Sequence, residues 1–448
     1  MNNSSAMEIR QSGDAGVASS GAADKKTIRK VMTASVAGTV IEWYDYSLYG
    51  AAAGLVINKL FFPSLSPTAA MLAAFATFAV GFLSRPLGGV IIAHMGDRYG
   101  RKPALIFALT LMGASTLALG LLPSYYTIGV LAPIILVILR LAQGFGAGAE
   151  LAGAQTFVAE YVPVSERGFY TSIINASTGI AIILSTSAFC LVTLLPDEAF
   201  MSWGWRVPFL VSVLLFAVSM YIRKNLDETP QYMEAMERAA EEKKKKKTPI
   251  LELLTNSPKQ VICGFMSLAG HQANGYALSV FSLSYMANTL GMPKSYGLMA
   301  LMIAVTGNTI MTPVMGKLAD RFGTTAIFSF GALFLFAFAF PLFWLLGTGN
   351  IVLGALGMTI AYSIGHGATS GAQGAFLANL FPTRYRYSGI ALSREMNSVI
   401  FAGSTPLIAT YLVTLADGAP TYVIFYLMFS SLLTLAAVQM AKTFKVHE

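Results

Sequence analysis

Long apolar segments follow one another along most of the chain and limit it to a helical membrane protein. A helix needs about 20 apolar residues to cross the hydrocarbon core of a bilayer. The apolar segments are continuous and do not alternate between neighbouring residues, which excludes a transmembrane β-barrel. The twelve expected crossings are residues 31–54, 68–92, 104–122, 129–157, 169–194, 204–223, 259–284, 294–315, 325–346, 350–377, 388–413 and 420–440.

The composition excludes a soluble enzyme, a disordered protein and a secreted disulfide scaffold. Only 12% of the 448 residues are charged and 55% are hydrophobic, whereas soluble domains carry about 25% charged residues. Cys190 and Cys263 lie inside apolar segments, so we expect small core side chains without a disulfide. The chain shows no phosphate-binding loop, metal-ligand spacing or catalytic triad. We therefore expect no enzyme activity, no cofactor and no metal.

The positive charge is a signal of membrane topology. The net charge is +8, and most basic residues lie in the two tails and in the connections after even-numbered crossings. Basic loops stay on the cytoplasmic side of a membrane, which predicts that both termini are cytoplasmic. The charge is explained in this way without a nucleic-acid partner.

One long polar segment, residues 224–258, divides the chain into two halves of six crossings. Thr229 and Pro230 fit the cap and first position of a helix, and five lysines follow at 243–247. We expect surface helices whose lysines face anionic lipid, or a solvated linker. The expected parts are a disordered tail (1–30), a six-helix bundle (31–223), the linker (224–258), a second six-helix bundle (259–440) and a cytoplasmic tail (441–448).

The two halves repeat each other in sequence. The corresponding segments are Met95–Lys102 with Leu318–Thr325, and Glu160–Pro163 with Asn379–Pro382, the second pair followed at the same offset by Arg167 and Arg386. Such a repeat predicts two pseudo-symmetric six-helix bundles with a binding site between them at mid-membrane.

A difference between the two copies suggests a latch. Arg101 and Glu160 of the first half are replaced by Thr324 and Asn379 in the second. We infer that Arg101 pairs with Glu160 on the cytoplasmic side and that this pair breaks when the inside opens. The alternative is that these are turn residues whose charges only follow the topology. The expected gating residues are Gly96, Asp97, Arg98, Gly100, Arg101 and Glu160.

The motifs resemble one branch of the major facilitator superfamily. They are Gly96–Lys102, Glu42–Asp45 with Tyr49–Gly50, Arg85–Gly89, Arg140–Gly144, Ser202–Phe209, Glu228–Pro230 and Phe381–Gly389. Together they are similar to the metabolite:proton symporters, which include carriers of shikimate, 2-oxoglutarate, citrate and proline or betaine. The resemblance implies a twelve-helix fold in which crossings one, four, seven and ten line a central cavity.

Ionisable residues inside the crossings are candidates for proton coupling, because a charge in the membrane is costly. At about 1.5 Å per residue, Glu42, Asp45, Arg140 and His271 all fall near the midplane. Glu42, Asp45 and Tyr49 share one face of the first crossing. We expect Asp45 to carry the proton, with Glu42 as second candidate and Arg140 as charge partner or carboxylate ligand. The alternative is a permanent ion pair between crossings one and four.

Substrate contacts are expected from polar residues at the same depth. His271, Gln272 and Asn274 are read as a polar cluster in the seventh crossing that faces the carboxylates. Arg394 and Glu395 depart from the branch pattern, and we expect them to snorkel or to pair with each other, with substrate contact as the alternative. The expected substrate-binding residues are Arg140, Gln143, Tyr49, His271, Gln272, Asn274 and Arg394. Gly144, Gly146 and Gly148 are read as small residues that allow close helix packing.

These observations predict a secondary active transporter of the bacterial inner membrane. We expect proton-coupled uptake of a small organic anion by alternating access, with membrane lipid as the surrounding partner and a monomer as the working unit. The alternative is a symporter of zwitterionic compatible solutes such as proline or betaine. The substrate, the proton stoichiometry and the direction of net flux are not encoded in a recognisable pattern.

Overall fold

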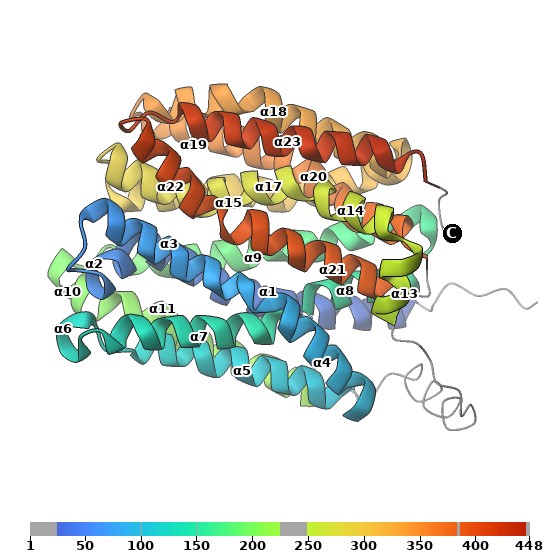
Figure 1. The fold of residues 1–448 in the computed structure, drawn as a ribbon, viewed down its shortest axis with the longest axis horizontal. Coiled ribbons are helices and arrows are strands. Elements are labelled where there is room, and N and C mark those ends of the chain that lie inside the picture. Colours follow the sequence, from blue (N-terminus) through green and yellow to red (C-terminus); the bar gives the residue numbers. More distant parts are fainter. Residues whose placement is uncertain (1–24, 100, 149, 225–248, 383–385, 445–448) are drawn as a thin grey trace, which may run out of the picture.

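The computed structural model describes residues 25–99, 101–148, 150–224, 249–382 and 386–444. Within these ranges the regular elements are α-helices with short 3-10 and π-helical segments, which run side by side along the long axis of the molecule (Figure 1). Consecutive elements join into twelve helical rods, and each rod coincides with one predicted crossing.

The first six rods form the N-terminal half. They are α1 (Lys25–Ala52) with η1 (Ala53–Ile57) and α2 (Asn58–Phe61), α3 (Pro67–Leu83) with α4 (Arg85–Tyr99), α5 (Arg101–Leu121), α7 (Leu131–Ala147) with α8 (Glu150–Tyr161), α9 (Arg167–Val192), and α11 (Val207–Lys224). The short helices α6 (Tyr125–Ile128) and α10 (Asp197–Ser202) lie in connections between rods.

The other six rods form the C-terminal half, preceded by α13 (Pro249–Asn256). They are α14 (Pro258–Ser267) with α15 (Ala269–Tyr276), η4 (Ala277–Phe281), α16 (Ser282–Ser284) and η5 (Tyr285–Thr289), then α17 (Lys294–Phe322), α18 (Thr324–Gly347), α19 (Ile351–Ile360) with η6 (Ala361–His366) and α20 (Gly367–Leu380), α21 (Arg386–Asn397) with η8 (Ser398–Gly403) and α22 (Thr405–Leu415), and α23 (Thr421–Ala441).

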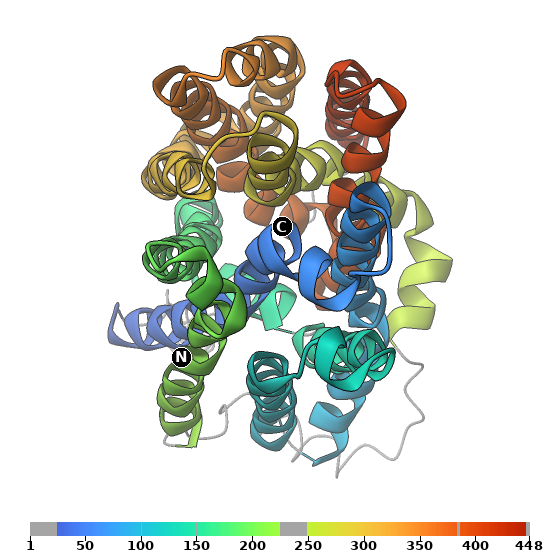
Figure 2. The ribbon, with the colours of Figure 1, turned by 90° about the vertical axis from the view of Figure 1, so that its left-hand side faces the viewer.

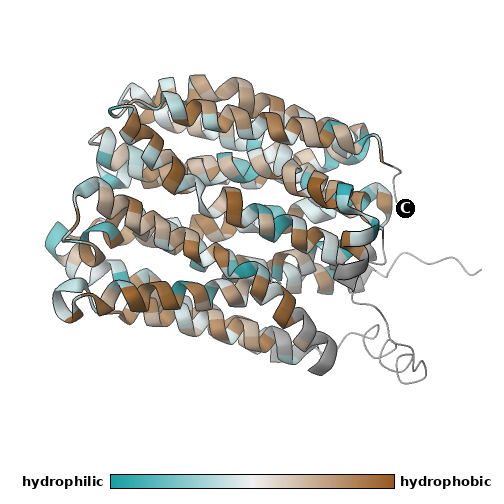
Figure 3. Cartoon of the chain, viewed as in Figure 1, coloured by the Kyte–Doolittle hydropathy of each residue, from teal (hydrophilic) through white to brown (hydrophobic). Residues whose placement is uncertain are grey.

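The rods have the length and composition of membrane helices. Eight described helical spans are long and apolar enough to cross a membrane, and two shorter apolar helices, Ile106–Leu121 and Gly204–Val218, lie in the third and sixth rods. Hydrophobic residues predominate along the rods (Figure 3). Large side chains such as Leu87, Leu214 and Phe425 are exposed on the outside, as expected for a surface in contact with lipid.

The two halves pack against each other as two layers. The N-terminal half lies below and the C-terminal half above in both views (Figures 1 and 2). Their contact is carried mainly by α9 against α17 and α20, and by α3 against η8 and α22. We call the end with α13 and the C-terminal end of α23 the linker end, and the opposite end, with α2, α6 and α10, the distal end.

The internal repeat has a structural counterpart. Arg167 donates from Nε to the carbonyl oxygen of Ala159 at 2.9 Å, and Arg386 donates from Nε to that of Ala378 at 2.8 Å. Each arginine binds the residue eight positions before it. The matching arginines of the two halves therefore close equivalent turns, as the repeat predicts.

Glycines bring the second and fourth rods into close contact, which confirms their reading as packing residues. A Cβ atom on Gly144 would lie 1.8 Å from the carbonyl oxygen of Gly81, and one on Gly148 would lie 2.0 Å from that of Arg85. From the other side, a Cβ on Gly88 would lie 1.9 Å from the carbonyl oxygen of Phe145. Backbone therefore packs directly on backbone along α3, α4 and α7.

The ends of some elements differ from the sequence prediction. Helix α1 already includes residues 25–30, ahead of the crossing expected from residue 31, and the lysine and arginine residues there are good helix formers. The segment around Thr229 and the lysines at 243–247 lie outside the described residues. Helix α13 buries Leu253 and exposes Leu254, which fits the predicted amphipathic stretch.

Candidate functional site

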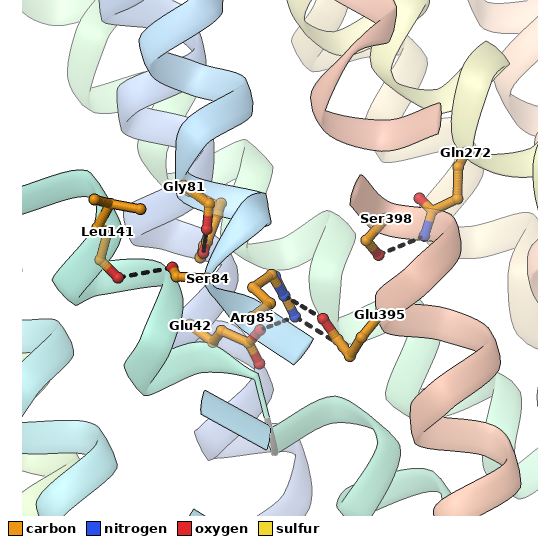
Figure 4. Close-up of polar contacts among 9 residues, drawn as sticks. Glu42, Gly81, Ser84, Arg85, Leu141, Gln272, Glu395 and Ser398 are labelled. Carbon is orange, nitrogen blue, oxygen red and sulfur yellow. Dashed lines mark hydrogen bonds and ion pairs between the residues drawn. The ribbon is translucent and has the colours of Figure 1, made fainter. Parts of the chain in front are cut away.

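Three charged side chains meet at the interface between the two halves. Arg85, the first residue of α4, donates from Nη2 to Oε1 of Glu42 in α1 at 2.9 Å. It also donates from Nε to Oε2 of Glu395 in α21 at 2.7 Å, and from Nη2 to Oε1 of the same residue at 3.4 Å. Figure 4 shows Arg85 between the two carboxylates. We call Glu42, Arg85 and Glu395 the triad.

The local fold explains why Arg85 points toward the interface. Ser84 separates α3 from α4, and its hydroxyl donates to the carbonyl oxygen of Leu141 in α7 at 2.7 Å. The guanidinium of Arg85 lies 5.1 Å from the ring centroid of Tyr46 and 5.6 Å from that of Phe82. The aromatic rings and the two carboxylates hold the arginine in a site that is closed to solvent.

The triad carries one positive and two potentially negative groups. Glu42, Arg85 and Glu395 are 1%, 3% and 4% exposed. An uncompensated charge at such a site is strongly unfavourable. Within the described part of the chain, Oε2 of Glu42 has no hydrogen-bond partner. Glu42 is therefore the less completely bound carboxylate of the two.

Asp45 lies in a separate chain of hydrogen bonds inside the N-terminal half. Thr116 of α5 donates to Oδ2 of Asp45 at 2.8 Å and accepts from Nε2 of Gln143 at 2.8 Å. Arg140 in turn donates to Oε1 of Gln143. The sequence pairs Arg140 with the acids of the first crossing. In the structure, Arg85 contacts Glu42, and Arg140 reaches Asp45 only through Gln143 and Thr116.

Arg140 is enclosed by aromatic rings and backbone carbonyls. Its guanidinium lies 4.0 Å from the ring centroid of Tyr49, and it donates to the carbonyl oxygens of Thr77 and Phe78 at 3.4 and 3.1 Å. Tyr49 is itself within 2.6 Å of the hydroxyl of Thr77. Arg140 and Tyr49 thus fasten α1, α3 and α7 to one another.

A second polar network crosses the interface nearer the linker end. His271 is bonded through Nδ1 to Thr369 at 2.8 Å and through Nε2 to Gln373 at 3.0 Å. Arg394 donates to Oε1 of Gln373 at 3.2 Å and to Oε1 of Gln155 in the other half at 3.4 Å. Arg394 thereby joins α21 to both α20 and α8.

The expectation for Arg394 and Glu395 was wrong. Both are buried and do not snorkel, and Glu395 bonds to Arg85 of the other half rather than to Arg394. The sequence shows two neighbouring opposite charges, but successive helix positions point about 100° apart. Each side chain therefore meets a different partner.

The polar residues of the seventh rod also have different partners. Gln272 donates to Ser398 at 3.5 Å, whereas Asn274 donates to Ser431 of α23 at 3.1 Å. His271 stacks on His366 with ring centroids 4.2 Å apart. His271, Gln272 and Asn274 therefore contact three different rods and do not form one cluster.

A small cavity of about 20 Å³ lies between the halves on the distal side of the triad. Its lining residues include Trp43, Tyr46, Phe78, Tyr276 and Thr186, from both halves. This volume holds about one water molecule, so the centre is occluded. Among the described residues, the indole nitrogen of Trp43 has no hydrogen-bond partner, which makes it a free donor at the cavity wall.

The two ends of the interface differ. At the linker end, Asp320 of α17 accepts from the backbone nitrogens of Gly168 and Phe169, and Asn175 of α9 donates to the carbonyl oxygen of Ser370 at 2.7 Å. At the distal end a pocket of about 340 Å³ opens, and its wall includes Lys294, which pairs with Asp197 at 3.1 Å. The described residues of the two halves are thus joined at the linker end, whereas the distal end is partly open.

Comparison with known proteins decides the family. A model of the Major Facilitator Superfamily matches residues 35–404. The chain belongs to the major facilitator superfamily.

Members of this superfamily of carriers resemble the chain over most of its length. It is 40% identical to the inner membrane metabolite transport protein YhjE of Escherichia coli (strain K12), over 86% of this chain and 88% of that protein. It is 36% identical to the shikimate transporter of the same strain (91% and 92%) and 35% identical to the proline/betaine transporter of Salmonella typhimurium (87% and 79%).

Solved structures of this superfamily share the fold. The partially occluded inward-open xylose transporter XylE from E. coli superimposes with a TM-score of 0.73 at 16% identity, over 94% of this chain and 98% of that chain. Together the relatives and the fold make this chain a multi-pass inner membrane carrier of a small molecule, and a carrier of this superfamily is not an enzyme.

The signature loop of the superfamily falls partly outside the described residues. The backbone is helical up to Tyr99 and again from Arg101. Gly100 lies outside the described residues. Only the backbone is described for Gly96, Asp97, Arg98, Arg101 and Glu160. The Arg101–Glu160 latch and the gating set therefore stay predictions.

Several site residues of this carrier were not assigned from the sequence. Arg85 was named only as part of a motif, and Glu395 was expected to snorkel or to pair with Arg394, so neither was given a role at a site. Thr116, Gln155 and Gln373 are buried polar residues that are singled out by their hydrogen bonds. Trp43 is singled out by an indole nitrogen that has no partner among the described residues. No group of three or more potential metal ligands occurs among the described residues.

Proposed function

We propose that this carrier imports a small organic acid together with protons by alternating access. The observation that carries the proposal is the triad, in which Arg85 joins a carboxylate of each half at the interface between the halves. Buried ionisable groups at such an interface are expensive and are typical of proton pathways. A carrier driven by protons needs such a group where the two halves separate.

The basic connections assign each end of the carrier to one side of the membrane. The basic connections lie at the linker end, so we assign that end to the cytoplasm. The described bonds at this end, from Asp320, Asn175 and Arg394, hold the inside closed. The distal pocket then faces the outside, and the structure represents a state that has closed inward before substrate release.

The substrate is proposed to bind in the occluded cavity when the distal end opens. Trp43 and Tyr276 stand on opposite halves of its wall, with ring centroids 6.4 Å apart. Arg140, Gln143, Tyr49, His271, Gln272, Asn274 and Arg394 remain the proposed polar shell of the site. Asp45 and Glu42 remain the two proposed proton carriers.

The proposal also covers the oligomeric state, the domain organisation and the substrate class. The carrier works as a monomer, with two six-helix bundles at 31–223 and 259–440 joined by a cytoplasmic linker at 224–258, whose lysines are expected to face solvent or anionic lipid. The acidic organic substrate is favoured because one named relative is a shikimate transporter.

A zwitterionic compatible solute is the second candidate. Three of the aromatic side chains in the cavity wall, Trp43, Phe78 and Tyr276, lie close together. Such rings attract quaternary ammonium groups, and a relative is named a proline/betaine transporter. This arrangement fits betaine or proline as well as the apolar ring of a cyclic acid.

One experiment separates these possibilities. The purified carrier is reconstituted into liposomes with an encapsulated pH dye, and hydroxy acids, 2-oxoglutarate, citrate, aromatic acids, proline and betaine are added outside in turn. We expect internal acidification with a carboxylate and none with its neutral analogue. Acidification with betaine or proline alone would favour the second candidate. Labelled solute uptake without acidification would contradict proton coupling.

A further inference from the structure

We propose that Glu42 and Glu395 compete for Arg85, and that this competition couples the proton to the opening of the linker end. The inference rests on the proposed proton symport and names the exchange that performs it. In the closed state Arg85 is bound to Glu395, and Glu42 holds the proton. When the linker end opens, Glu395 moves away with the C-terminal half, Arg85 takes Glu42 as its partner, and the proton leaves to the cytoplasm.

The geometry favours Glu395 as the ionised partner in the closed state. Glu395 receives two bonds from Arg85, at 2.7 and 3.4 Å, whereas Glu42 receives one at 2.9 Å. Oε2 of Glu42 is buried and lacks a partner among the described residues. A buried carboxylate oxygen without a donor is costly when charged, and a protonated carboxyl lowers this cost.

Charge balance supports the exchange. With a proton on Glu42, the closed triad is neutral, because the charge of Arg85 is balanced by Glu395. After opening, the N-terminal half is again neutral, because Arg85 is balanced by an ionised Glu42. Glu395 is then hydrated by the water that enters the open interface. Each state avoids a buried unpaired charge, and one proton is released per opening.

The placement of the partners makes the exchange depend on opening. Arg85 and Glu42 belong to the same half and stay together when the halves separate. Glu395 belongs to the other half, so its bond to Arg85 is broken by the separation itself. No other rearrangement of the triad is required.

The neighbouring charges do not remove the need for the exchange. The titratable or charged side chains that act on Glu42 or on its partner Arg85 are Arg85 of α4, Glu395 and Arg394 of α21, Glu150 of α8, Arg140 of α7, Tyr46 of α1 and Tyr276 of α15. Glu150 is a further carboxyl group near Glu42 and belongs to the same half. Arg394 is held by Gln155 and Gln373, so Arg85 is the arginine that contacts Glu42.

The competition predicts opposite effects for the two acids. In Glu42→Gln, Arg85 has only Glu395 as an ionised partner, which favours the closed linker end. In Glu395→Gln, Arg85 has only Glu42, which favours the open linker end and keeps Glu42 without a proton. If the triad only held the halves together, both variants would shift the linker end in the same direction.

The test measures both conformation and coupling. Thr171 is fully buried and packs on Gly374 of the other half near the linker end, so Thr171→Cys, with Cys190 and Cys263 replaced by alanine, reports opening by maleimide labelling in inside-out vesicles. We expect less labelling in Glu42→Gln and more in Glu395→Gln than in the parent. Glu198→Gln, a change at an exposed glutamate of α10, is the matched control and should not alter labelling.

Coupling is measured in proteoliposomes as internal acidification on addition of the panel solute that acidifies liposomes with the wild-type carrier. Folding is checked by counterflow of the same solute in labelled form. We expect both triad variants to lose acidification while counterflow is still measurable, and the control Glu198→Gln to keep both. Equal labelling changes in the two triad variants, or full acidification in Glu395→Gln, would overturn the inference. Loss of acidification in Asp45→Asn with normal acidification in Glu42→Gln would also overturn the inference. In that case proton symport itself would still hold. Absence of acidification in the wild type would contradict both proposals.

Discussion

The carboxylate of Asp320 caps a helix of the opposite half by accepting from the backbone nitrogen of Gly168 at 2.7 Å. It also accepts from that of Phe169 at 2.9 Å. Both nitrogens lie in the first turn of α9, where backbone donors lack partners within the helix and the helix dipole favours a negative charge. The bond joins α17 to α9 across the closed linker end.

Asp320→Ala should weaken the closed linker end. Two capped donors lose their acceptor, which costs about 1–2 kcal/mol. We expect increased labelling of Thr171→Cys from the cytoplasmic side in this variant. Unchanged labelling would show that the cap does not contribute to closure.

Gly144→Ala should destabilise the N-terminal half. The added Cβ would meet the carbonyl oxygen of Gly81 at 1.8 Å, and such overpacking costs about 1–3 kcal/mol. The melting temperature in detergent should fall. Gly347→Ala is the control, because nothing lies within 4 Å of a Cβ at that position, and its melting temperature should stay unchanged.

Trp43→Phe should weaken substrate binding without destabilising the protein. Phenylalanine keeps an aromatic ring at this position. It removes the indole N–H donor of a residue that lines the cavity, and this donor has no hydrogen-bond partner among the described residues. If the substrate uses this donor, KM for uptake should rise by about tenfold, the value of one hydrogen bond of about 1.4 kcal/mol.

Trp205→Phe is the matched control for that variant. Its indole nitrogen also lacks a partner among the described residues, but the side chain packs against Phe61 and Phe209 away from the cavity. Its KM should not change. An equal rise of KM in both variants would exclude a specific role for Trp43.

Arg140→Lys should lower both stability and transport. Lysine cannot reproduce the planar fork that binds Gln143 and the carbonyl oxygens of Thr77 and Phe78. We expect a loss of stability of about 2 kcal/mol, measured as a lower melting temperature, together with weaker substrate binding. The exposed Arg321→Lys serves as control. Normal stability with weakened binding would assign Arg140 to the substrate alone.

Much of the fold could be predicted because bilayer thickness fixes the length of each apolar segment. The twelve crossings match the twelve rods, and Gly144 and Gly148 mark the close contact of the second and fourth rods as expected. The depth of Glu42, Asp45 and His271 also follows from a constant rise per residue. Each of these properties depends on one segment or on a local pattern.

The partners of these residues could be decided only by the tertiary structure. Glu42 and Asp45 are three positions apart, about 60° around the helix axis, and this angle is enough to direct Glu42 to Arg85 and Asp45 to Thr116. The sequence indicated that Glu42 and Asp45 are buried, because they lie inside a long apolar segment. Which charge meets which depends on the rotation of each helix and on its neighbours, and these are set by the packing of all twelve rods together.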